Sequence, residues 1–139
     1  MSHERAIELV WAGKGLRFSG RGTLPETPTI TIDGDGEAGP SPMITLLLAA
    51  AGCAASDVVL ILKKMRVALD GLHVTVGGTR REENPRRYLS LRYRFEVRSP
   101  DVTQDQADRA VALSLEKYCS VAHSLAPDIA IVHEAVVVR

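Results

Sequence analysis

The chain has 139 residues, about the size of one domain, and is long enough to bury a hydrophobic core without staples. Its 17 basic and 17 acidic residues cancel, and 4% of its residues are aromatic, which argues against a nucleic-acid-binding protein. The two cysteines, Cys53 and Cys119, are far apart and form no CxxC or CxxH pair. This argues against a permanent disulfide and against a metal site, and no cofactor is expected.

The first forty residues predict a small β-meander. Residues 5–11 alternate, with Ile7, Leu9 and Trp11 on one face, which is typical of a strand. Glycines bracket a second short strand in GLRFSGRG, and TITID at 29–33 is a third. No apolar segment of the kind found in secretory signals occurs here, so a cytoplasmic protein is expected.

A long helix is predicted from Pro42 to Leu69, with Ser41 as its cap and Pro42 in its first turn. It is apolar almost all round from Leu46 to Leu62, so it should be covered by protein on every side. The run is slightly short for a membrane span and contains Asp57, which favours a core helix in a protein without a membrane segment. Because one domain has little chain left to cover it, we expect a homodimer.

Next come two strands, 72–83 and 88–98, which predict an antiparallel hairpin. Thr103 and Gln106 form a capping box that opens a second helix through Lys117, and residues 128–139 close the chain as a strand. The residues expected to face inward share the spacing of these elements. They are Leu89, Leu91, Tyr93, Phe95 and Val97 in the hairpin, and Ala107, Ala110, Val111, Leu113, Ser114 and Tyr118 in the helix. The fold class is therefore α+β, in a single domain 1–139.

The residues alone leave the purpose of the cysteines open. Cys53 lies in an apolar helix, where a thiol is either a small core hydrophobe or a reactive group. Asp57 shares its helix face, would oppose thiolate formation, and is expected to accept hydrogen bonds from backbone or from an arginine. His123 follows Cys119 by four residues, so the two would share a face if the helix continued, either as packing residues or in a shared metal-binding or catalytic role.

Two passages carry a resemblance to a known family. SPMITLLLAAAGCAASDVVLILKKMR resembles the central-helix signature of the OsmC/Ohr family, and LSLEKYCSVAHSL resembles its second cysteine motif. GTRREENPRRYLSLRYRFEV between them is similar to the family's hairpin. EKYCSV looks closest to the YhfA-like branch of the family.

The resemblance implies an intertwined homodimer whose long central helices are wrapped by antiparallel sheets from both subunits. It also implies a thiol peroxidase that reduces organic hydroperoxides in oxidative stress defence. Cys53 would attack the peroxide, Cys119 would resolve the sulfenic acid as a disulfide, and a dithiol partner would reduce it. An arginine of the meander, Arg17 or Arg21, would stabilise the thiolate.

One departure from the family pattern leaves a second function possible for this chain. Better-known branches have a glutamate near the start of the helix that holds this arginine, whereas this chain has Met43, Ile44 and Thr45 there. The alternative is a non-enzymatic dimeric module that binds or senses a small hydrophobic ligand, with the cysteines lining its pocket.

Overall fold

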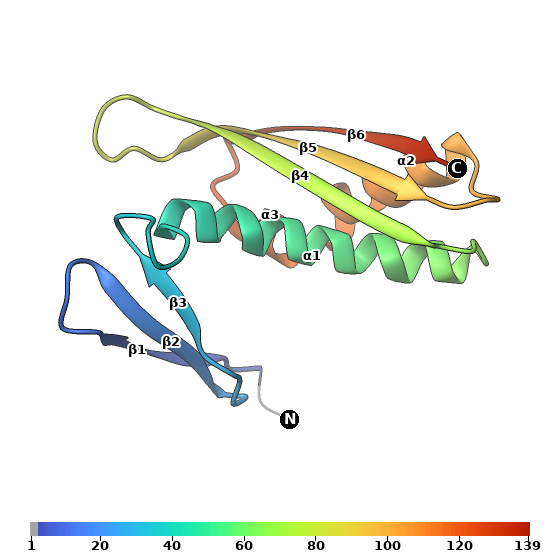
Figure 1. Cartoon of the computed structure of the whole chain (residues 1–139). Helices are drawn as coiled ribbons and strands as arrows, with labels where there is room; N and C mark the ends of the chain where they lie inside the picture. The colour runs from blue at the N-terminus through green and yellow to red at the C-terminus, as the bar shows by residue number, and fades with distance from the viewer. Residues whose placement is uncertain (1–2) are drawn as a thin grey trace. The chain divides into compact units, whose positions relative to one another are not determined.

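A computed structural model describes residues 3–139 (Figure 1). The chain forms two compact units, Met1–Leu46 and Leu47–Arg139.

The N-terminal unit is built on the predicted meander. Strands β1 (Ala6–Trp11), β2 (Arg17–Leu24) and β3 (Ile30–Asp33) form an antiparallel sheet in the order β1-β2-β3. Within residues 3–46 the buried residues are Gly20 and Asp33, so this sheet has no hydrophobic core of its own. Its large apolar side chains are instead exposed to solvent; they are Ile7, Leu9, Val10, Trp11, Leu16, Leu24 and Ile30.

The Asp33 carboxylate organises the loop that follows β3. It accepts hydrogen bonds from the backbone N–H groups of Ala38 (2.9 Å), Asp35 (2.9 Å) and Glu37 (3.3 Å). The Arg17 guanidinium adds an ion pair at 3.3 Å. The N–H bonds, with a smaller contribution from Arg17, hold the pKa of Asp33 below its ordinary value, because they favour the charged carboxylate. Polar contacts to this carboxylate, and not apolar packing, therefore hold the loop together.

Helix α1 runs from Pro42 to Lys64 and begins as predicted, since the Ile44 N–H donates to the Ser41 hydroxyl. It ends five residues before the predicted Leu69. Arg66 has a left-handed φ of 61°, the Val67 N–H donates to the Leu62 carbonyl, and the Arg66 N–H donates to the Lys63 carbonyl. These are the bonds of a Schellman motif, here with arginine where glycine is usual.

The C-terminal unit contains a sheet of β4 (Gly71–Arg80), β5 (Tyr88–Arg98) and β6 (Ala130–Val138). β5 is the central strand, antiparallel to β4 as the hairpin prediction required and parallel to β6. Leu91, Tyr93, Phe95 and Val97 are buried as predicted, but the prediction for Leu89 is wrong, because it is exposed and Tyr88 is buried instead. A register shift opposite Thr79 and Arg80 inserts one extra residue and reverses the alternation there.

The second helix, predicted through Lys117, consists of an α-helix and a π-helical turn, and a separate short helix follows it. The Thr103–Gln106 capping box is confirmed, and α2 runs from Gln104 to Leu113. A π-helical turn, Ser114–Tyr118, follows, and then the short helix α3, Ser120–Ser124. Tyr118 is half-exposed rather than inward, because the wider turn rotates it off the helix stripe.

The helices α1, α2 and α3 lie on one face of the β4-β5-β6 sheet (Figure 1). The chain buries one stripe of α1, formed by Ala50, Ala54, Val58 and Leu62. Leu48 and Leu60 remain 58% and 60% exposed, so residues 3–139 of a single chain do not wrap this helix on every side. By length and composition alone α1 could cross a membrane, a property that core helices of soluble proteins share.

Candidate active site

Helix α1 carries the first cysteine beside its buried stripe. Cys53 is partly buried and directly precedes Ala54, which is fully buried. Asp57 follows one turn later on the same side of the helix, as its spacing predicted, and is also partly buried.

The second cysteine is positioned by the π-helical turn. The Cys119 N–H donates to the carbonyl of Ser114, five residues back, at 2.7 Å. Cys119 then leaves helical geometry (φ −67°, ψ 104°) and becomes the N-cap of α3, where its sulfur accepts a hydrogen bond from the Ala122 N–H at 3.5 Å. Its side chain is fully buried.

These elements bring three chemically active groups together. The sulfurs of Cys53 and Cys119 and a carboxylate oxygen of Asp57 all lie within 4.8 Å of one another. The Ser114 hydroxyl connects the two segments, because it lies 3.0 Å from Asp57 Oδ2 and 3.3 Å from the Ala54 carbonyl oxygen. The donor to Asp57 within this chain is therefore a hydroxyl, and a backbone or arginine donor across a subunit interface stays a prediction.

The surroundings of Cys119 disfavour its thiolate form. Burial raises the pKa of Cys119 from 9.0 to about 11. The Ala122 N–H acts in the opposite direction, whereas hydrogen bonding and charge from Cys53 and the charge of Asp57 raise the pKa further. The Cys119 thiol is therefore protonated at neutral pH.

Tyr93 is a further polar group on the buried side of β5. Its ring is 2% exposed and stacks on Phe95 with 6.0 Å between the ring centroids. Burial, followed by the charges of Cys119 and Cys53, raises the pKa of Tyr93 to about 12. Within residues 3–139 its hydroxyl has no hydrogen-bond partner, so a neutral donor remains unsatisfied in the core near the cysteines.

His123 does not join the cysteine pair. Its Nδ1 lies 2.9 Å from the carbonyl oxygen of Cys119, and its Nε2 lies 3.1 Å from that of Glu116. The imidazole therefore lies against the backbone of the π-helical turn and of Cys119, and this position supports a structural role.

The two candidate arginines belong to the N-terminal sheet and are held there by carboxylates. Arg17 pairs with Asp33 (3.3 Å) and with Glu37 (3.1 Å), and Arg21 pairs with Glu8 (2.7 Å). Arg17 thus has two acidic partners in its own unit, although the glutamate expected at the start of α1 is missing.

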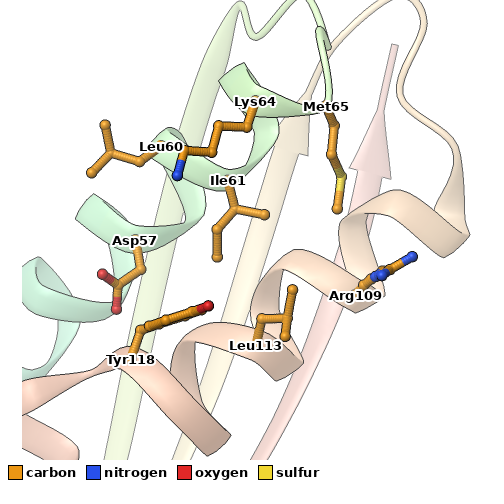
Figure 2. A pocket seen from close by; sticks show the side chains of 8 residues that line it. All are labelled: Asp57, Leu60, Ile61, Lys64, Met65, Arg109, Leu113 and Tyr118. Atoms are coloured by element: carbon orange, nitrogen blue, oxygen red, sulfur yellow. The ribbon is translucent and has the colours of Figure 1, made fainter.

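A cavity of about 580 Å³ opens beside Asp57 (Figure 2). Figure 2 shows Asp57 and Tyr118 at one end and the charged groups of Lys64 and Arg109 farther along. Leu60, Ile61, Met65 and Leu113 complete the lining, so the walls between the charged groups are apolar. An organic molecule that entered this cavity would reach the carboxylate that lies beside the two sulfurs.

Sequence reasoning did not identify three parts of the site: the Ser114 link, the Tyr93 hydroxyl and the cavity. Ser114 was predicted to face inward, and a buried serine requires a hydrogen-bond partner, so this was an available signal. The orphan hydroxyl of Tyr93 has no sequence signal, because tyrosine in a strand packs like any aromatic residue.

Comparisons with known proteins agree on one family. A model of the OsmC-like protein family matches residues 34–134. Protein YhfA of Escherichia coli K12 is 41% identical over 126 residues, which cover 90% of this chain and 92% of YhfA.

Solved structures show the same fold. An OsmC-like protein from Mycoplasma pneumoniae superposes with a TM-score of 0.84 over 100% of both chains, at 16% identity. An organic hydroperoxide resistance protein from Elizabethkingia anophelis superposes with a TM-score of 0.69 over 99% of both chains, at 12% identity. The family match, the identity to YhfA and the shared fold together confirm the resemblance seen in the sequence: this chain belongs to the OsmC-like protein family.

Proposed function

We propose that this chain is a dithiol peroxidase that reduces organic hydroperoxides, with Cys53 and Cys119 as its redox pair. The observation that carries the proposal is the approach of the two sulfurs to within 4.8 Å from segments far apart in sequence. The names of structural neighbours support it, since proteins from Elizabethkingia anophelis and Legionella pneumophila are described as organic hydroperoxide resistance proteins.

The unequal burial of the two cysteines supports the roles proposed for them. Cys53 is the accessible sulfur, so its thiolate attacks one peroxide oxygen, breaks the O–O bond and becomes a sulfenic acid, while the alkoxide leaves as an alcohol after protonation. Cys119 is buried, and its thiol attacks the sulfenic sulfur and expels water to give the disulfide. A disulfide bond is about 2.05 Å long, so small side-chain rotations would close the remaining gap.

The site requires further partners. Arg17 or Arg21, each pre-oriented by its own carboxylate, would supply the cation that favours the Cys53 thiolate. The exposed apolar faces of α1 and of the N-terminal sheet support a homodimer in which the chain, 1–139, forms one domain with its partner. A dithiol reductant would reopen the disulfide, which requires a reducing compartment such as the cytoplasm.

A stopped-flow experiment tests the proposal. Reduced protein is mixed with cumene hydroperoxide, and stopped flow measures how fast the peroxide is consumed. Intact mass and peptide mapping of the product then show which thiols were lost. We expect the loss of two thiols per chain and a Cys53–Cys119 disulfide. The Cys119→Ser variant should stop at a Cys53 sulfenic acid, and Cys53→Ser should react no faster than a free thiol. Equal reactivity of Cys53→Ser and the wild type would contradict the proposal.

A second function is supported by the carboxylate beside the thiols. Asp57 opposes thiolate formation, and the adjoining cavity combines apolar walls with Lys64 and Arg109. Both features suit a module that binds a small hydrophobic ligand with an anionic group. In that case hydroperoxide would oxidise the protein no faster than it oxidises a free thiol, and an alkyl carboxylate would raise the melting temperature.

A further inference from the structure

The proposed peroxidase cycle leaves Asp57 without a role. Its carboxylate lies within 4.8 Å of both sulfurs, and its negative charge opposes the thiolate that the cycle requires. Within residues 47–139 no lysine, arginine or histidine forms an ion pair with it; its partner is the neutral Ser114 hydroxyl. Three groups that can become anions therefore face one another, and the unit that carries them, residues 47–139, pairs no side-chain cation with the carboxylate.

We propose that the reduced chain binds a thiophilic divalent cation, of which Zn²⁺ is the representative, through Cys53, Asp57 and Cys119. A divalent ion supplies the missing positive charge and converts the mutual repulsion of these groups into attraction. The donor set, two sulfurs and one oxygen, favours Zn²⁺ over Mg²⁺ or Ca²⁺, which prefer oxygen ligands alone.

The geometry is close to what this ion requires. With bonds of about 2.3 Å to sulfur and about 2.0 Å to oxygen, a tetrahedral Zn²⁺ places its ligand atoms about 3.5–3.8 Å apart. The three atoms here lie within 4.8 Å of one another, so rotations of the side chains complete the contraction. Three protein ligands leave the fourth position for water, as in open zinc sites.

The groups around the donor atoms support this arrangement. Ser114 holds the Asp57 carboxylate at 3.0 Å, the kind of contact that orients a metal ligand. The π-helical turn and the N-cap bond from Ala122 fix Cys119 in place. The cavity lined by Asp57 provides a path from solvent (Figure 2).

Binding of the ion and oxidation of the pair exclude each other. A disulfide has no thiolate to coordinate the ion, so two-electron oxidation releases it. With an organic hydroperoxide, the zinc dithiolate, ROOH and two protons give the disulfide, ROH, water and free Zn²⁺. This coupling to hydroperoxide rests on the proposed function; metal binding itself does not.

Metal titration of the reduced full-length chain without oxygen tests the proposal. Zn²⁺ is titrated against a chromophoric chelator, and Co²⁺ is used separately to detect the charge-transfer absorption of thiolate ligation. We expect one ion per chain and a higher melting temperature with Zn²⁺. Asp57→Asn and Ser114→Ala should each weaken binding by about 10–100-fold, and Cys53→Ser and Cys119→Ser by more.

The control is His133→Gln, which removes an exposed histidine of β6 outside the cluster and should bind zinc as the wild type does. Protein oxidised with diamide, a two-electron thiol oxidant, should bind none, and this arm is informative even if hydroperoxides do not react. Absence of binding to the reduced wild type overturns the proposal. Unchanged binding by Cys119→Ser does so as well, because the ion would then lie elsewhere. Circular dichroism of each variant separates ligand loss from misfolding.

Discussion

The two units of this chain are stabilised in different ways. The C-terminal unit buries a continuous set of apolar side chains between the β4-β5-β6 sheet and its helices, whereas residues 3–46 bury one glycine and one aspartate. The N-terminal unit relies on ladder hydrogen bonds and on the Asp33 carboxylate, and it exposes its large apolar residues. The difference shows that a small three-stranded sheet can be well defined by polar contacts while its apolar face remains available to another surface.

Removing a ring from the C-terminal core should have the largest effect. Phe95→Ala empties a fully buried position in the central strand, and such changes cost about 3–5 kcal/mol of folding free energy. Urea unfolding followed by circular dichroism measures the loss. Val132→Ala, at a half-exposed position of the neighbouring strand, is the control and should change stability by no more than about 0.5 kcal/mol. Equal losses in the two variants would contradict this description of the core.

A charge on the exposed face of α1 tests whether another subunit covers it. In an isolated chain Leu48→Glu should be almost neutral, because this side chain is 58% exposed. In the proposed homodimer it should weaken association by at least about tenfold, since a buried leucine contributes about 1.5–3 kcal/mol. Sedimentation equilibrium over a range of concentrations distinguishes the outcomes. Leu48→Met keeps the surface apolar and should associate as the wild type does.

Tyr93→Phe should be a small stabilising change. The substitution removes a buried hydroxyl that has no partner and keeps the ring stacked on Phe95, so unfolding should cost about 1 kcal/mol more. Thermal and urea unfolding of the reduced protein measure this. A loss of stability would show that the hydroxyl is bonded in the folded protein, and a slower reaction of the cysteines in the same variant would identify sulfur as the acceptor.

The stability of the N-terminal unit should depend on pH, because the charged Asp33 carboxylate holds its loop. The folded pKa of Asp33 lies below its ordinary value of 3.8, so the charged carboxylate stabilises the unit above that value. The stabilisation is lost as the pH falls through 3.8 toward the lower folded value. Asp33→Asn should therefore lower the melting temperature at pH 7, and the difference should shrink in acid. The control is Asp35→Asn, the exposed neighbour. If the difference in melting temperature between Asp33→Asn and the wild type is independent of pH, the charge of Asp33 does not stabilise the unit.

Much of the fold followed from local patterns. Alternation located the strands, and the Ser41 cap and the Thr103–Gln106 box located the starts of two helices. The errors have particular causes. A register shift between β4 and β5 turned the Leu89 side chain to solvent, and the left-handed backbone of Arg66 ended α1 before Leu69. Neither cause has a strong sequence signal. The register shift depends on how two strands pair, and the end of α1 depends on an arginine in a position that glycine usually takes.

The site was less predictable than the fold. Spacing placed Asp57 beside Cys53, but nothing in the spacing of Cys119 required it to meet Cys53; that expectation came from the family resemblance. The proximity results from tertiary packing of α1 against the α2–α3 segment, which the Ser114 hydroxyl joins to Asp57. The cavity and the orphan hydroxyl of Tyr93 likewise arise from packing between segments distant in sequence.

The π-helical turn also determines how this site can be altered during evolution. Each residue of an α-helix advances the chain by about 100° around the axis, and a π-turn accommodates one additional residue without a break. In ordinary α-helical geometry with all five residues kept, Cys119 would point about 100° farther around the axis, because the π-turn gives it the direction that the preceding residue has in an α-helix. A homologue that lacks one residue in this turn should therefore form an ordinary α-helix there and still direct its second cysteine toward the first.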